Sequence, residues 1–290
     1  MEKVLSFIIR LRRHGILGIL RLIPVNVAYY TPKAIKEYVK QVFGRLPIVY
    51  DYFWRRNNPS ERIAFERFIT TAAGGREERK SIVKAISETH RWVECGHTQR
   101  EMLEVIAQIL NFPVNIDGVI VEAGSFKGGS AAKFSRARAY RNRRLIIFDS
   151  FEGLPDNHEP HDRTIFGETA SFPKGAYEGS LDLVRHNIRK YGRLEVCEFV
   201  KGWFEDTMAA FDKPIIAGYV DVDLASSTRT CMKYLFPHLV PGGVIFSQDG
   251  HLPLVINVLD DDYFWENEVG VKRPRMVGLG LRKLVQIWKD

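Results

Sequence analysis

The sequence predicts an α/β protein with a doubly wound sheet of seven strands, preceded by a helical segment. Residues 117–155 read in order as a strand, a glycine turn, a helix and a second strand, and each strand ends in an acidic residue. Apolar runs alternate with helical segments through the rest of the chain, and two final runs, 275–279 and 283–288, predict a terminal antiparallel hairpin. We therefore expect a helical appendage over residues 1–112, covering a ligand cleft, and a sheet domain over residues 113–290.

The turn after the first strand predicts a ligand site. The first apolar run, 119–121, ends in Glu122, and a turn rich in small residues follows, which lets the backbone approach a ligand. Free amides at the start of the next helix, 130–140, form a polar cradle. The second run, 145–148, ends in Asp149, whose carboxylate suits the two hydroxyls of a ribose. The turn lacks the G-x-G-x-x-G spacing of a dinucleotide site, so we expect an adenosine-type ligand without a pyrophosphate.

The later elements follow the same alternation. The third to fifth strands are expected at 194–200, 215–222 and 244–247, the last after a turn at 241–243. Helices are expected at 61–71, 77–92, 98–110, 180–191, 204–211, 226–239 and 254–267. Thr98 and Glu101 have the spacing of a capping box. Because the carboxyl ends of parallel strands meet at one edge of a sheet, we expect the residues that follow these strands to lie together.

The composition limits the binding partners and the redox setting that we expect for this protein. The chain has 290 residues and a net charge of +7, from 42 Lys and Arg against 35 Asp and Glu. That surplus suits an acidic substrate, nucleic acid, an anionic membrane or solubility alone. The positive charge is not gathered into a basic, aromatic stripe in the second half, so we expect no nucleic-acid partner. The three cysteines are far apart and form no ligand motif, which predicts buried thiols in a reducing, cytoplasmic compartment.

Residues 3–23 have the pattern of a basic amphipathic helix. One face holds Lys3, Arg10, Arg13, His14 and Arg21, opposite a broad aliphatic face. Such a helix can lie on an anionic membrane, which would place the protein peripherally at the inner face. It can equally pack on the rest of the protein or on a second subunit of a homodimer. Both interpretations stay open from sequence.

Three stretches carry a resemblance to a known family. The first combines VEAGSFKGGS with FDSFEGLP, the second is FVKGWFEDTM, and the third is YVDVDLASSTRTCMKYLFPHLVPGGVIFSQDGH. Together they resemble the macrocin O-methyltransferase family, over roughly residue 119 to the C-terminus. The resemblance implies a class I, Rossmann-like methyltransferase sheet and transfer of a methyl group from S-adenosylmethionine to a sugar hydroxyl of a small glycoside or related natural product. The cofactor residues expected are Glu122, Ala123, Gly124, Ser125, Gly128, Gly129, Ser130, Asp149, Ser150, Glu152, Gly202, Trp203 and Asp221.

The resemblance also implies a metal site. In the family, the acid at the position of Asp221 and two consecutive acids after the fifth strand hold a hard cation such as Mg²⁺, which prefers oxygen ligands. Here the first of those two acids is Gln248, whose carbonyl oxygen can ligate but brings no charge. The expected ligands are therefore Asp221, Gln248 and Asp249. The alternative is that Asp223 caps the next helix and Asp249 contacts the cofactor or solvent.

A sugar hydroxyl becomes a good nucleophile once it loses its proton, so the reaction needs a metal, a base or both. The candidate catalytic residues are Asp221, His251, His158 and His161. The two last histidines lie in a polar insertion, 152–179, that we expect to act as a substrate lid. Two rival functions stay open: a nucleic-acid methyltransferase, and a cofactor-binding protein without turnover.

Overall fold

A computed structural model describes residues 59–137 and 143–290. By contact density the chain divides into two units, residues 1–62 and 63–290, and the account below concerns the second. The expected helix at 3–23 lies outside the described residues, as does the end of the helix expected at 130–140. The role of residues 1–112 as a separate appendage stays a prediction. In the described part of the chain, no helix is both long and apolar enough to cross a bilayer.

Seven strands form one mixed sheet in the order β3-β2-β1-β4-β5-β7-β6. The strands are β1 (Val119–Ala123), β2 (Leu145–Asp149), β3 (Cys197–Lys201), β4 (Ile215–Val220), β5 (Leu239–Ser247), β6 (Met276–Val277) and β7 (Val285–Trp288). The first five run parallel, and β7 pairs antiparallel with both β5 and β6. The strand order reverses between β1 and β4, which is where doubly wound sheets bind their ligands. The predicted fold class, with its terminal antiparallel hairpin, is confirmed.

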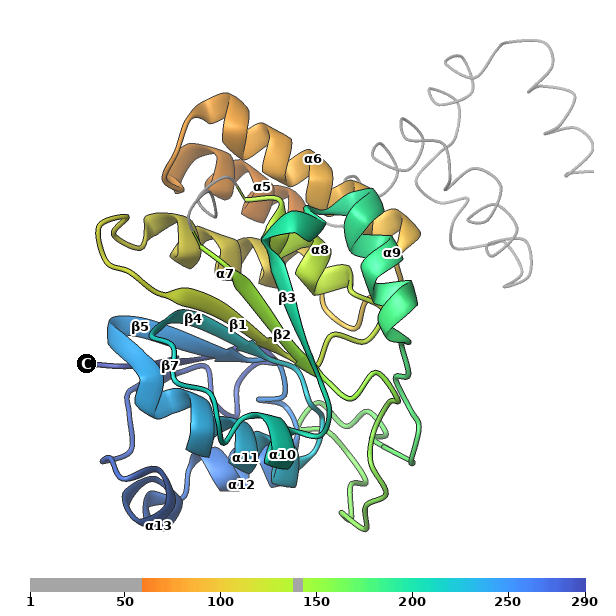
Figure 1. The fold of residues 1–290 in the computed structure, drawn as a ribbon, viewed down its shortest axis with the longest axis vertical. Helices are drawn as coiled ribbons and strands as arrows, with labels where there is room; N and C mark the ends of the chain where they lie inside the picture. Colours follow the sequence, from red (N-terminus) through yellow and green to blue (C-terminus); the bar gives the residue numbers. More distant parts are fainter. Residues whose placement is uncertain (1–58, 138–142) are drawn as a thin grey trace, which may run out of the picture. The chain divides into compact units, whose positions relative to one another are not determined.

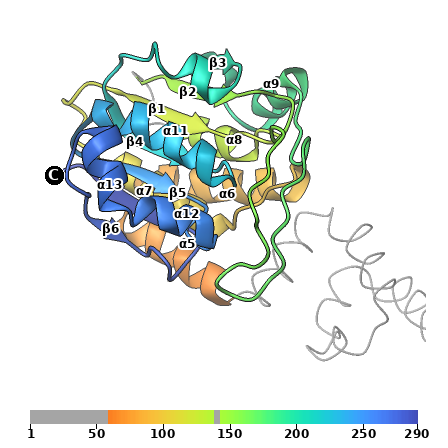
Figure 2. The same ribbon diagram turned by 90° about the horizontal axis from the view of Figure 1, so that it is seen from below.

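Helices cover both faces of this sheet (Figure 1). One layer holds α5 (Pro59–Thr71), α6 (Arg76–Trp92), α7 (Gln99–Asn111), α8 (Gly129–Ser135) and α9 (Leu181–Tyr191). The other holds α10 (Phe204–Thr207), α11 (Ala225–Leu235), α12 (Pro253–Leu259) and α13 (Asp262–Phe264), and the last three are seen in front in Figure 2. β4 is buried along its whole length, because side chains on both of its faces pack under helices.

Capping explains several helix starts. The predicted capping box of α7 is present: Thr98 accepts from the Glu101 amide, and Glu101 accepts from the Thr98 amide. Ser180 caps α9 through the Leu183 amide. α11 has no cap of its own. Its first amides are instead bound by Glu159 of the insertion, at 2.7 Å from Ala225 N and 2.8 Å from Ser226 N.

Some predicted boundaries are wrong, for local reasons. The third strand begins at Cys197, because Leu194–Val196 forms a 3-10 turn. The helix expected to reach residue 239 ends at Leu235 and continues as a 3-10 turn that contains Pro237, which has no amide to donate. The turn expected at 241–243 lies inside β5, where the Gly242 amide donates to the Lys289 carbonyl and the Lys289 amide to the Gly243 carbonyl.

The helix expected at 254–267 is also wrong as one piece. It is three: α12, α13 and a π-helical turn, Trp265–Val269. The Asp261 carboxylate accepts from the Tyr263 amide and so starts a new helix. The indole of Trp265 donates to the Leu259 carbonyl at the end of α12, which fixes the break in the buried core.

Candidate functional site

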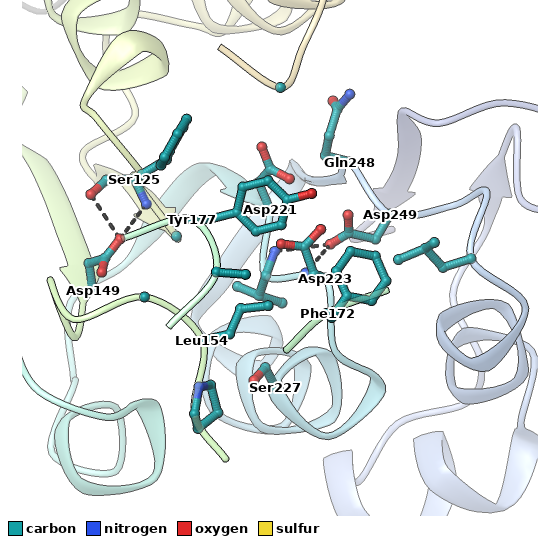
Figure 3. Close-up of a pocket in the computed structure, with 18 of the residues that line it drawn as sticks. Ser125, Asp149, Leu154, Phe172, Tyr177, Asp221, Asp223, Ser227, Gln248 and Asp249 are labelled. Atoms are coloured by element: carbon teal, nitrogen blue, oxygen red, sulfur yellow. Dashed lines mark hydrogen bonds between the residues drawn. The ribbon is translucent and has the colours of Figure 1, made fainter. Parts of the chain in front are cut away.

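A cavity of about 580 Å³ opens along the carboxyl ends of β1, β2, β4 and β5. It gathers predicted site residues from five separate stretches of chain, and Figure 3 shows part of its lining. The predicted residues that line it are Gly124, Ser125, Gly129, Ser130, Asp149, Ser150, Gly202, Trp203, Asp221, Gln248, Asp249 and His251. Those that do not line it are Glu122, Ala123, Gly128, Glu152, His158 and His161. The volume suits a drug-sized ligand.

The glycine turn forms one wall of the cavity. Gly124 has φ +81°, and a Cβ there would lie 2.0 Å from the Asp221 carbonyl oxygen of the adjacent strand end. No other residue type fits this close approach. Asp149 fixes the turn from β2, because its Oδ2 accepts from the Ser125 amide at 2.6 Å and the Ser125 hydroxyl at 2.9 Å. Its Oδ1 accepts from the Phe151 amide at 2.7 Å. The carboxylate is thereby held at the cavity wall.

Glu122 lies beneath this wall and is completely buried. Neither of its carboxylate oxygens has a hydrogen-bond partner among the described residues. Burial raises the pKa of Glu122 to about 8, and the nearby charges of Asp149 and Asp221 act in the same direction. The Ser130 hydroxyl opposes this pKa shift from nearby, without the geometry of a hydrogen bond. Glu122 is therefore a largely neutral acid under the site at neutral pH.

Three carboxylates meet at the ends of β4 and β5. One oxygen each of Asp221, Asp223 and Asp249 lies within 4.8 Å of the others. Asp249 Oδ2 accepts from the amides of Val222 and Asp223, both at 3.0 Å, and so shapes the loop after β4. Burial, together with the Asp249 charge, raises the pKa of Asp221 to about 8. Sequence reasoning placed Asp223 at this strand end but did not include it among the expected metal ligands, and its carboxylate belongs to the cluster.

Gln248 lines the same cavity but faces another partner. The Tyr219 hydroxyl lies 3.2 Å from Gln248 Oε1 and 3.2 Å from Asp221 Oδ2, and its single proton serves one of them at a time. In Figure 3 the Gln248 side chain points away from Asp223 and Asp249. Its Nε2 has no hydrogen-bond partner among the described residues. The role of Gln248 as a metal ligand stays a prediction.

The three candidate histidines have different surroundings. His251 lines the cavity, is 8% exposed, and its Nδ1 has no described hydrogen-bond partner. Burial, together with the charge of Lys283, lowers the pKa of His251 to about 4. His161 does not line the cavity, and it pairs with Glu159 at 3.0 Å, which steadies the carboxylate that caps α11. His158 is exposed on the insertion.

The insertion supplies aromatic walls that the sequence did not single out. Phe172 and Tyr177 line the cavity, and Figure 3 shows the Tyr177 ring beside Asp221 and Asp223. Phe166 stacks on His251 with ring centroids 6.3 Å apart, and the Ile165 amide donates to the His251 carbonyl. These contacts join the predicted lid to the end of β5.

Sequence reasoning did not identify two basic residues that line the cavity. Lys283 enters from the segment before β7 and faces the three carboxylates, while His97 enters from the loop before α7. The His97 ring lies 2.6 Å from the buried Lys133 ammonium. Neither position belongs to a motif, so only the fold could reveal them.

Comparisons with known proteins agree with this geometry. The family model described as macrocin-O-methyltransferase (TylF) matches residues 76–274. The 8-demethyl-8-(2,3-dimethoxy-alpha-L-rhamnosyl)-tetracenomycin-C 4'-O-methyltransferase of Streptomyces olivaceus is 35% identical over 46% of this chain and 53% of its own length. The demethyldecarbamoylnovobiocin O-methyltransferase of Streptomyces niveus is 30% identical over 56% of this chain and 66% of its own length. The chain thus spans about half to two thirds of these relatives.

Two solved structures share the fold. The O-methyltransferase NovP covers 72% of this chain and 88% of its own, with a TM-score of 0.53 and 22% identity. The calicheamicin methyltransferase CalS11 covers 80% and 94%, with a TM-score of 0.51 and 17% identity. The strand order of the sheet is the same methyltransferase variant that the resemblance implied. Since the family model matches more than half of this chain, the chain belongs to the macrocin O-methyltransferase family.

Proposed function

We propose that this protein is an S-adenosylmethionine-dependent O-methyltransferase that acts on a sugar hydroxyl of a small glycoside. The observation that carries the proposal is the single cavity that joins the glycine turn to the carboxylate cluster and His251. The part of the cavity beside the glycine turn suits a nucleoside-type cofactor. The part beside the carboxylate cluster and His251 suits removal of a proton from an acceptor. The names of the Streptomyces relatives support a sugar-bearing natural product as acceptor.

The residues present fit the cofactor. Gly124 and Gly129 let other protein atoms pack closely against the turn, since a Cβ at Gly129 would lie 2.4 Å from Cys95 Sγ. Asp149 presents a fixed carboxylate for ribose hydroxyls. The acid-rich lining suits the positive charge of a sulfonium. When bound, S-adenosylmethionine supplies an electrophilic methyl carbon. The protein positions the acceptor hydroxyl, and the His251 ring, which lines the cavity and is uncharged at neutral pH, is the group placed to receive its proton.

The substitution Asp149→Asn tests the ribose contact. Asparagine keeps an acceptor for Ser125 but loses the charge, so we expect binding of S-adenosylhomocysteine to weaken by about 1.5–3 kcal/mol, roughly 10- to 150-fold. Isothermal titration calorimetry on both proteins measures this, and Asp212→Asn, an exposed position outside the cavity, is the matched control. Equal affinity in wild type and Asp149→Asn would reject the assignment.

We also propose that a hard cation such as Mg²⁺ binds the cluster of Asp221, Asp223 and Asp249, because carboxylate oxygens are the ligands it prefers. Its role would be to lower the pKa of the acceptor hydroxyl. Calorimetric titration with Mn²⁺ should show one site, and Asp221→Asn should weaken it at least about tenfold. Gln248→Asp should strengthen it by adding a charge. Mn²⁺ binding that is indifferent to both changes would place the ion elsewhere.

A further inference from the structure

Glu159 does not line the cavity, yet its side chain holds the start of the helix that follows two acids of the carboxylate cluster. One oxygen accepts from the Ala225 amide at 2.7 Å, and the other accepts from the Ser226 amide at 2.8 Å and the Ser226 hydroxyl at 2.6 Å. Burial raises the pKa of Glu159, but the hydrogen bonds from Ser226 and Ala225 outweigh that effect and bring the pKa below its ordinary value. Glu159 is therefore an ionised cap at the positive end of the α11 dipole.

The loop between β4 and α11 carries both acids, and every amide from residue 222 to residue 226 is hydrogen-bonded. Asp223 has φ +60°, in the left-handed region that residues other than glycine rarely adopt, so the contacts around it must hold it there. On one side, Asp249 accepts from the amides of Val222 and Asp223, both at 3.0 Å. The Leu224 amide donates to the Val222 carbonyl at 2.6 Å. On the other side, Glu159 holds the next two amides along the chain.

The stretch that carries Glu159 also holds an aromatic wall of the cavity. The Asn157 side chain lines the cavity, and its Nδ2 donates to the Phe172 carbonyl at 3.0 Å. The His161 ring meets the Phe172 ring edge-on, with centroids 4.7 Å apart. The same His161 side chain is 3% exposed and lies 3.0 Å from the Glu159 carboxylate. Residues 157–161 therefore join the wall formed by the insertion to the start of α11.

We infer that Glu159 is a positioning residue for the carboxylate cluster: by fixing the start of α11, it keeps Asp221 and Asp223 in the arrangement that a cation requires. The inference rests on the cation of the proposed function and adds to it a residue outside both the cavity and the cluster. Carboxylates that are already held in place lose little conformational freedom when they bind an ion, whereas a released loop must first be ordered. A purely structural cap would stabilise α11 without changing the affinity of the cluster for a cation.

Removing the cap tests this inference. Mn²⁺ is titrated calorimetrically into the full chain, as wild type and as Glu159→Ala. We expect the variant to bind Mn²⁺ at least about tenfold more weakly, the usual effect of losing a group that orients metal ligands. Glu159→Gln keeps one acceptor oxygen and should lose less affinity, so it serves as the test if the alanine variant does not fold.

Two controls separate positioning from charge and from stability. Glu168→Ala removes an exposed acid of the same insertion that lines the cavity, so it makes the same change in net charge without releasing α11. Ser180→Ala removes the cap of α9, which accepts from the Leu183 amide at 3.3 Å, and so weakens a helix start outside the cavity. Both controls should bind Mn²⁺ as the wild type does. A Glu159→Ala variant that binds Mn²⁺ as tightly as the controls would overturn the inference.

Amide hydrogen exchange supplies a readout that needs no cation. In Glu159→Ala the amides of residues 225 and 226 lose their acceptor and should exchange faster. If Glu159 also positions the cluster, the amides of Val222 and Asp223 should exchange faster too, although their acceptor, Asp249, is unchanged. Faster exchange confined to residues 225 and 226 would identify a purely structural cap and contradict the inference. A wild type that binds no Mn²⁺ would instead reject the proposed cation, and the exchange measurement would still decide the role of Glu159.

Discussion

Replacing His251 with alanine is expected to lower kcat by about 10²–10⁴-fold, the usual contribution of a positioned general base. Of the three candidate histidines, His251 is the one that lines the cavity beside the carboxylate cluster, and its Nδ1 is free of described partners. Its pKa of about 4 keeps the ring neutral, and so able to accept a proton, at neutral pH. Affinity for S-adenosylhomocysteine should stay close to that of the wild type.

The methylation rate is measured in single-turnover experiments, in which mass spectrometry detects the methylated product. His186→Ala, at an exposed position on α9, is the matched control, and His158→Ala tests the rival candidate outside the cavity. Both should retain wild-type rates. Because the pKa of His251 is about 4, protonation of this ring should lower the methylation rate only near pH 4, and not near pH 6.5 as for an ordinary histidine. A fast His251→Ala variant would assign proton removal to the carboxylate cluster instead.

Replacing Glu122 with glutamine should remove most of the dependence of stability on pH that this residue causes. The pKa of Glu122 is about 8 in the folded protein, against an ordinary value of 4.5. Between these two values the folded state holds a proton that the unfolded state has released, so the free energy of unfolding falls as pH rises. The stabilisation is complete below about pH 4.5 and is lost as pH rises through about 8. The total loss is on the order of 5 kcal/mol.

Denaturant titrations between pH 5 and about 8.5 measure this slope. We expect the ligand-free wild type to lose stability across the range, and Glu122→Gln to lose clearly less, because glutamine matches the neutral acid in size and has no charge to bury. Asp221, whose pKa is also about 8, leaves a residual slope of the same sign. Glu266→Gln, at an exposed position, should keep the wild-type slope. Parallel slopes in wild type and Glu122→Gln would mean that Glu122 is ionised in the folded state.

The sequence alone determined the order of the elements and the edge of the sheet where function gathers. Strands, helices and the glycine turn follow from local periodicity and backbone freedom, which neighbouring residues set. Asp149, Asp221, Asp249 and His251 were placed together because the carboxyl ends of parallel strands must share one edge. The same local reasoning missed the breaks near Asp261 and Pro237, where a side-chain cap or a missing amide overrode the helical pattern.

Only the tertiary structure decided which side chains face the cavity. His251 and His161 are both histidines near polar loops, yet one lines the cavity and the other holds the carboxylate that caps α11. Lys283 and His97 reach the cavity from elements far away in sequence. Glu122 lies near the end of β1 as Asp149 lies at the end of β2, but Glu122 is completely buried and does not line the cavity. The direction, burial and charge state of a side chain depend on contacts between distant parts of the chain, and no local pattern records those contacts.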